Sequence, residues 1–229
     1  MKSKQTRPSK IIDAIKDMFS PEDIDKTTLI FRTTGHLYIS AVREIQTKLE
    51  NLNDEFKYTK NRNPIHIIKT RIKTPDSIMG KLKRRGLEIS VESAQENLTD
   101  IAGIRVICPY IDDIYLISNM LTIQDDIELL RTNDYIKNPK PNGYRSLHLI
   151  ISVPVFLSNM KKLIKAEVQI RTIAMDFWAS LEHDIAYKLP ENKTAAIKEE
   201  LKDCASVINK TDLRMQNLNS VLKKYGTSE

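Results

Sequence analysis

The chain has few cysteines and no long apolar run, and these two features exclude several classes of site and location. Its 229 residues include 2 cysteines, Cys108 and Cys204, which form no CxxC pair. We therefore expect free thiols, without a disulfide or a zinc site. No window approaches the ~20 apolar residues that span a bilayer, and charges occur throughout residues 1–20. The sequence thus predicts a cytoplasmic protein that does not interact with a membrane.

The short motifs of common nucleotide and hydrolase sites are also missing. The sequence has no Gly-rich Walker loop, no GxSxG and no HExxH, which argues against nucleophilic and zinc chemistry. Positive charge is present instead, with a net charge of +6 and a pI near 9.1. This balance favours an anionic partner, which could be a nucleotide, a nucleic acid or an acidic lipid.

Hydrophobic periodicity predicts an α/β fold with helices at both ends. Helical spacing occurs at 11–19, 36–58, 75–85, 112–121, 172–189 and 193–223. Strand patterns occur at 65–73, 103–108, 127–137, 146–155 and 164–171. This order predicts a mixed sheet with antiparallel neighbours. We expect an N-terminal helical region at 1–60, a central domain at 61–190 and a C-terminal helix at 191–229.

The strand at 164–171 has two faces of different character. One face carries Ala166, Val168 and Ile170, and the other carries Glu167, Gln169 and Arg171. An acid, an amide and a guanidinium in one row suit a site that handles a metal and a polar substrate. Under the simpler interpretation, Glu167 is only the ion-pair partner of Arg171, and strand spacing does not decide between the two.

A basic segment at 71–85 contains six Lys or Arg residues. The expected strand places Arg71 and Lys73 on one face, and the expected helix places Ser77, Lys81 and Arg84 on one face. These groups, with the N-terminal amides of the helix, could bind a phosphate chain. A solvated basic helix without a ligand is the alternative.

Asp100 and Arg105 flank the start of the strand at 103–108. A charged Arg105 inside an apolar strand is costly unless its face opens on a cleft or a partner. Asp100 could be a turn or cap carboxylate. With Glu167 as a second carboxylate it could instead bind Mg²⁺, which prefers oxygen ligands.

The turn-rich segment at 138–148 contains the third cluster of polar side chains. Its alternation places Tyr144, Ser146 and His148 on one face. A tyrosine at a strand start can stack a purine, although packing is the commoner role, and His148 can be a hydrogen-bonded structural group.

The C-terminal helix carries an apolar stripe with heptad-like spacing over residues 197–222. Such a stripe requires a helical partner. Both the helix at 36–58 of the same chain and a second copy of the protein fit this requirement.

Four motifs in register resemble the synthetase domain of the RelA/SpoT alarmone enzymes. They are Arg71-Ile-Lys-Thr-Pro-Asp-Ser-Ile, Asp100-Ile-Ala-Gly-Ile-Arg105, Pro141-Asn-Gly-Tyr-Arg-Ser-Leu-His148 and Glu167-Val-Gln-Ile-Arg-Thr172. The segment Ala174-Met-Asp-Phe-Trp-Ala-Ser-Leu-Glu-His183 follows them. The resemblance covers about residues 60–190 and is to the stand-alone small alarmone synthetases of the RelP type.

The resemblance implies a fold, a reaction and an assembly. The fold is a nucleotidyltransferase-like mixed sheet flanked by helices. The reaction is Mg²⁺-dependent transfer of pyrophosphate from ATP to the ribose 3′-hydroxyl of GDP or GTP, which gives ppGpp or pppGpp and AMP. The assembly is a homotetramer built on the terminal helices.

The resemblance also implies residue roles. Arg71 and Arg105 would sandwich the adenine, and Lys73, Ser77, Lys81 and Arg84 would bind the ATP phosphates. Asp100 and Glu167 would bind Mg²⁺, with Glu167 as the base for the 3′-hydroxyl. Tyr144 would stack the guanine, with Gln169, His148 and Lys140 on the acceptor side. Asp176 stands where relatives have Asn, so its contact with nucleotide stays open.

Two other functions also fit parts of the sequence. A nucleotidyltransferase that acts on RNA or a small molecule would use similar carboxylates and would release pyrophosphate instead of AMP. A non-catalytic RNA-binding module would use the basic segment at 71–85, with binding that depends steeply on salt.

Overall fold

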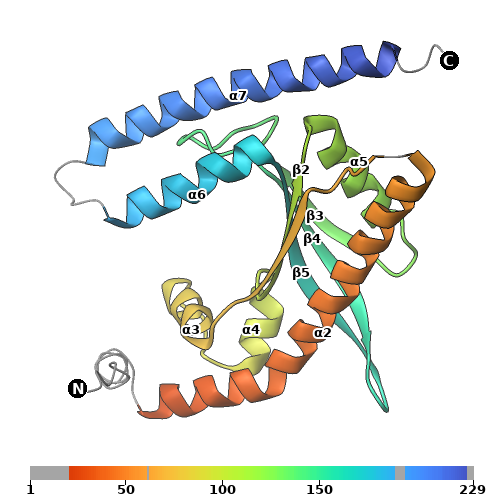
Figure 1. Ribbon diagram of the computed structural model, residues 1–229. Coiled ribbons are helices and arrows are strands. Elements are labelled where there is room, and N and C mark those ends of the chain that lie inside the picture. Colours follow the sequence, from red (N-terminus) through yellow and green to blue (C-terminus); the bar gives the residue numbers. More distant parts are fainter. Residues whose placement is uncertain (1–20, 61, 189–193, 226–229) are drawn as a thin grey trace, which may run out of the picture.

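A five-stranded mixed sheet forms the centre of the molecule. The computed structural model describes residues 21–60, 62–188 and 194–225 (Figure 1). The strands are β1 (Ile67–Ile72), β2 (Ala102–Cys108), β3 (Glu128–Asp134), β4 (Leu147–Phe156) and β5 (Lys161–Thr172), in the order β1-β2-β5-β4-β3. Strands β2 and β5 are parallel, and the other neighbours are antiparallel. The fold class expected from the sequence is confirmed.

Helices lie on both sides of this sheet. They are α2 (Pro21–Lys60), α3 (Pro75–Arg84), α4 (Val91–Asn97), α5 (Ile111–Thr122), α6 (Ile173–Lys188) and α7 (Thr194–Tyr225). Figure 1 shows α2 and α5 on one side of the sheet, and α3 and α6 at opposite ends of the other side. The predicted helix at 11–19 lies outside the described residues. No helix in the described ranges is long and apolar enough to cross a bilayer.

The core lies between the sheet and α2. Ala166, Val168 and Ile170 of β5 are completely buried, as the alternation predicts. The expected stripe of α2 meets this face, with Ile45 and Leu49 also completely buried. Burial of each Leu or Ile side chain contributes about 1.5–3 kcal/mol. The apolar face of β5 is therefore fixed against α2, and its polar face must point to the opposite side of the sheet.

Helix α7 packs on α6 and α5. The alternative in which it packs on the helix at 36–58 is wrong, because polar anchors hold α7 on the end of β5 and on α6. The Thr172 hydroxyl donates to Asp212 Oδ2 at 2.6 Å, and the Trp178 indole donates to the Leu201 carbonyl at 2.8 Å. These bonds attach α7 to the end of β5 and to α6, while α2 lies beyond the sheet (Figure 1).

Asp212 provides a test of this anchoring. Burial raises the pKa of Asp212, and the hydrogen bond from Thr172 opposes only part of the increase. Ionisation of this carboxylate in the folded protein therefore costs stability, and the cost develops as pH rises through its raised folded-state pKa. Asn at this position carries no charge and can still accept the Thr172 hydrogen bond.

We expect Asp212→Asn to unfold at higher urea than the unchanged protein at pH 7.5. The gain should shrink as pH falls toward the ordinary range of an aspartate. Urea denaturation at several pH values measures this difference. A variant that is less stable by the same amount at every pH would contradict the account.

Candidate active site

The polar face of β5 lines a cleft on one face of the sheet. Register places Gln169 beside Arg105 of β2 and beside His148 of β4, and it places Glu167 beside Gly103. Gly103 in turn pairs with Arg71 of β1. Because glycine has no side chain, no side chain of β2 stands between Arg71 and Glu167 in this row. The resulting cleft of about 400 Å³ is lined from β1, β2 and β5 by Lys69, Thr70, Arg71, Gly103, Ile104, Arg105, Glu167, Gln169 and Arg171.

Asp100 lies at one end of this face, just before β2, and binds two lysines. Lys73 Nζ and Lys81 Nζ lie 2.5 and 2.8 Å from its Oδ2. Burial would raise the pKa of Asp100, but the two ammonium groups outweigh burial and hold the pKa below its usual value. The end of β1 and α3 therefore supply a pair of cations to one carboxylate.

Helix α3 begins where the sequence predicts. Thr74 caps its N-terminus by accepting from the Ser77 amide, and Pro75 occupies the first turn. The helix buries Ile78 and Leu82, so Lys81 is directed toward Asp100. The predicted phosphate ligands Ser77 and Arg84 are exposed on α3 and are not among the residues that line the cleft.

Asp100 and Glu167 fit a hard cation. Asp100 Oδ1 is buried and has no hydrogen-bond partner within the described part of the chain. Asp100 lies close enough to Glu167 for repulsion between the two carboxylates to oppose part of the lowering of the Glu167 pKa that is described below. No group of three or more His, Cys, Asp or Glu side chains in the described residues could bind a metal. Two carboxylates are sufficient for Mg²⁺, which takes its remaining ligands from water and phosphate.

A chain of hydrogen bonds runs from Glu167 to Tyr144. His148 Nδ1 lies 3.1 Å from Glu167 Oε1, and His148 Nε2 lies 2.8 Å from the Tyr144 hydroxyl. Since a carboxylate only accepts, Nδ1 carries the proton of this hydrogen bond. Burial would raise the pKa of Glu167, but the bonds from His148 and Gln169 hold it below its usual value. Glu167 is therefore ionised at neutral pH.

Arg171 connects this chain to α6. Its guanidinium is buried and donates to the Tyr144 hydroxyl at 2.5 Å and to Gln169 Oε1 at 3.0 Å. It also donates to Asp176 Oδ1 at 3.3 Å. The simpler interpretation, in which Glu167 is the partner of Arg171, is therefore wrong: Arg171 pairs with Asp176, and Glu167 pairs with His148.

Asp176 collects three cations in the first turn of α6. Lys69, Arg105 and Arg171 each place a nitrogen 3.3 Å from its carboxylate, and Asp176 is 7% exposed. Sequence reasoning left Asp176 open and overlooked Lys69. The alternation of the strand could have indicated Lys69, because it is two residues before Arg71 and thus lies on the same face of β1.

The β3–β4 loop (residues 135–146) supplies an aromatic edge to the site. Lys140 Nζ lies 4.7 Å from the ring centre of Tyr135 and 4.8 Å from that of Tyr144. Tyr144 is half-buried, and it packs against the cluster formed by Trp178, Ala179 and Ala205. Sequence reasoning proposed Lys140 and Tyr144 but missed Tyr135, for which no pattern gave a signal.

The motifs and geometry agree with comparisons to known proteins. Residues 70–192 match the family described as a region found in RelA/SpoT proteins. The chain belongs to this family.

Curated and solved relatives of this family resemble most of the chain. It is 46% identical over 179 residues to the GTP pyrophosphokinase YwaC of Bacillus subtilis, an alignment that covers 78% of this chain and 85% of YwaC. Small alarmone synthetase 2 of B. subtilis superposes with a TM-score of 0.75 at 42% identity, covering 83% of this chain and 98% of that one. Small alarmone synthetase 1 of B. subtilis bound to pppGpp gives 0.73 at 32% identity, covering 80% and 93%.

Proposed function

We propose how this RelA/SpoT-family chain, a GTP pyrophosphokinase that makes (p)ppGpp, carries out its reaction. The β,γ-pyrophosphate of ATP passes to the ribose 3′-hydroxyl of GDP or GTP, and AMP leaves. The observation that carries the proposal is the meeting of Arg71, Arg105 and Glu167 in one cleft, beside the Asp100 cluster. A polyanionic donor needs such cations, and a hydroxyl acceptor needs an ionised base.

The donor side comprises β1, β2 and α3. Arg71 and Arg105 would hold the adenine between their guanidinium planes, which stack well on flat rings. The phosphate chain would extend toward α3. Lys73, Ser77, Lys81 and Arg84 are the proposed phosphate ligands there. Because Lys73 and Lys81 are already held together by Asp100, their charges are concentrated before a phosphate reaches them.

The acceptor side comprises β4, β5 and the β3–β4 loop. Tyr144 would stack the guanine, with Gln169 and His148 beside it and Lys140 near the acceptor phosphates. The Tyr144 hydroxyl is held by His148 and Arg171, so the Tyr144 ring is oriented before the acceptor binds. Asp176 would hold Arg105 and Arg171 and would not contact nucleotide itself.

Glu167 is the proposed base. Its carboxylate accepts the proton of the 3′-hydroxyl as the new bond from O3′ to the β-phosphorus of ATP forms and the bond between the β-phosphorus and the α,β-bridging oxygen breaks. Asp100 and Glu167 would hold Mg²⁺, which neutralises phosphate charge when bound. The lysines beside Asp100 bind the pyrophosphoryl group as it moves.

Product analysis tests this proposal. The purified protein is incubated with ATP, Mg²⁺ and either GDP or GTP, and the nucleotides are resolved by anion-exchange chromatography. A more highly phosphorylated guanosine with equimolar AMP is the expected result. Free pyrophosphate would indicate a nucleotidyltransferase, and intact nucleotides would favour a non-catalytic role.

Tyr144→Ala tests the side assignment. We expect the KM for the acceptor to rise by roughly 5- to 150-fold, because loss of base stacking costs ~1–3 kcal/mol. The KM for ATP should change by less than about twofold. Steady-state kinetics with each nucleotide varied in turn measures both values. A selective rise in the KM for ATP would mean that the two nucleotide sites are exchanged.

An exposed apolar face on α6 and α7 supports the proposed homotetramer. Phe177 and Leu181 of α6 are exposed beside Val207, Met215 and Leu218 of α7. The two helices form adjoining apolar grooves of about 420 and 550 Å³. Apolar surface of this kind marks interaction sites. Light scattering at micromolar concentration tests the assembly, and a strictly monomeric particle would exclude it.

A further inference from the structure

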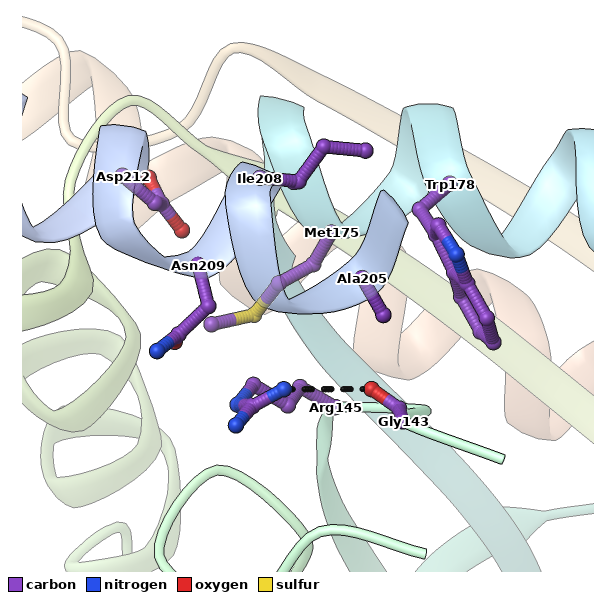
Figure 2. Close-up of a pocket in the computed structure, with 8 residues that line it drawn as sticks. All are labelled: Gly143, Arg145, Met175, Trp178, Ala205, Ile208, Asn209 and Asp212. Carbon is purple, nitrogen blue, oxygen red and sulfur yellow. Dashed lines mark hydrogen bonds between the residues drawn. The ribbon is translucent and has the colours of Figure 1, made fainter. Parts of the chain in front are cut away.

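Helix α7 makes an unusually close contact with the β3–β4 loop at Gly143. Gly143 has a φ of 87°, which few residues other than glycine adopt. A Cβ atom added there would lie 2.6 Å from Ala205 Cβ and 3.7 Å from the Cα and carbonyl oxygen of Lys202. The contact therefore requires glycine on the loop and a small side chain on the helix. Figure 2 shows Ala205 directed toward Gly143 across a narrow gap.

The space around this contact is nearly full. The cavity that Gly143, Ala205, Met175 and Trp178 help to line has a volume of only about 10 Å³ (Figure 2). That volume holds at most about one water molecule, and side chains in such packed regions cannot grow without moving their neighbours. A larger side chain at position 205 must therefore push the loop away from α7.

The residue that follows Gly143 is Tyr144, which is fixed at both ends. Its side chain packs against the cluster formed by Trp178, Ala179 and Ala205, and its hydroxyl bonds to His148 and Arg171. Tyr144 is thus held by the α6–α7 cluster on one side and by hydrogen bonds from the sheet at its hydroxyl. Displacement of Gly143 would move one end of Tyr144 while the other remains bound.

The rest of the loop would transmit such a displacement. Gly143 donates its amide to the Lys140 carbonyl at 2.8 Å, and Lys140 donates its amide to the Tyr144 carbonyl at 3.2 Å. Asn142 also donates to Glu182 of α6 at 3.2 Å. The two backbone bonds make residues 140–144 a compact turn. Lys140 and Tyr144 would then shift together.

We propose that Ala205 of α7 is a positioning residue for the acceptor nucleotide, because its contact with Gly143 seats the turn that carries Lys140 and Tyr144. The inference rests on the proposed function only in that Tyr144 is taken to bind the acceptor. Ala205 itself does not touch a substrate. It is not among the residues that line the cleft, and its effect passes through the loop.

Ala205→Val tests the proposal, with Ser206→Val as the matched control. Both changes introduce the same β-branched residue into α7, but Ser206 is exposed. We expect Ala205→Val to raise the KM for GDP roughly tenfold, since overpacking at this contact displaces the loop. The KM for ATP should change by less than about twofold. Ser206→Val should leave both values within about twofold of the unchanged protein.

Ala205→Ser keeps the test informative if the valine variant does not fold. Serine adds one oxygen, so the KM for GDP should rise by less than in Ala205→Val but in the same direction. Unchanged KM for GDP in folded variants would overturn the proposal. Equal increases in both KM values would overturn it too, because they would indicate a general loss of structure.

A double-mutant cycle separates this proposal from the assignment of Tyr144. If Ala205 acts through the turn, Ala205→Val should raise the KM for GDP by a smaller factor in a Tyr144→Ala background, because only the part of the effect that passes through Lys140 would remain. An undiminished effect there would overturn the proposed route. If Tyr144→Ala alone raises the KM for ATP and not for GDP, the acceptor assignment fails independently of what Ala205 does.

Discussion

Glu167→Gln should lower kcat by roughly two to four orders of magnitude while the protein stays folded. Glutamine has nearly the same shape and can still accept from His148 Nδ1, so the hydrogen-bonded chain to Tyr144 is retained. The amide cannot take up a proton, and it lacks the negative charge that the Glu167 carboxylate has near Asp100. The loss should therefore appear in kcat, with modest changes in the KM for either nucleotide.

The matched control for this variant is Glu128→Gln, the same exchange at an exposed position of β3. It should leave kcat within about twofold of the unchanged protein, because surface substitutions away from a site have small effects. Circular dichroism and thermal unfolding confirm that both variants are folded. If Glu167→Gln retained more than about a tenth of the turnover, Glu167 would not be the base.

Asp176→Ala should have the largest effect on stability. It removes the carboxylate that is bound to the buried guanidinium of Arg171. An uncompensated buried charge typically costs about 3–5 kcal/mol. Lys69 and Arg105 are more exposed, so their contribution is small. At about 2–4 °C per kcal/mol, we expect Tm to fall by roughly 6–20 °C.

Asp125→Ala is the control for Asp176→Ala, because Asp125 is exposed in the turn after α5. Its Tm should change by no more than about 2 °C. A fall of similar size in both variants, or an unchanged Tm in Asp176→Ala, would mean that Arg171 does not depend on Asp176. The role of Asp176 as a link between Arg105 and Arg171 would then be wrong.

The sequence predicted those features that depend on local periodicity. The alternation of β5 separated Ala166 and Val168 from Glu167 and Gln169, because a strand directs neighbouring side chains to opposite faces. The helix predicted at 75–85 is present as α3, with Pro75 in its first turn and with Gly86, just beyond its end, at a positive φ of 66°. The strands also lie within a few residues of their predicted positions.

Contacts between side chains that are far apart in the sequence could not be predicted from local periodicity. Nothing in the spacing indicates that His148, rather than Arg171, would pair with Glu167, since that choice depends on the register between β4 and β5. The binding of Asp176 to three cations depends similarly on where α6 begins relative to β1 and β2. The apolar stripe of α7 suits the helix at 36–58 as well as a second copy of the protein. Bonds from Thr172, Trp178 and Gln216, which no periodicity indicates, place α7 on α6 and α5.

The most direct test of the account follows the β-phosphorus of ATP. ATP labelled in its β-phosphate is incubated with the protein, Mg²⁺ and GDP, and the products are separated. The account predicts that the label moves, together with the γ-phosphate, to the 3′ position of the guanosine nucleotide and that AMP is released without it. Recovery of the label in free pyrophosphate would place the attack on the α-phosphorus and would contradict the account.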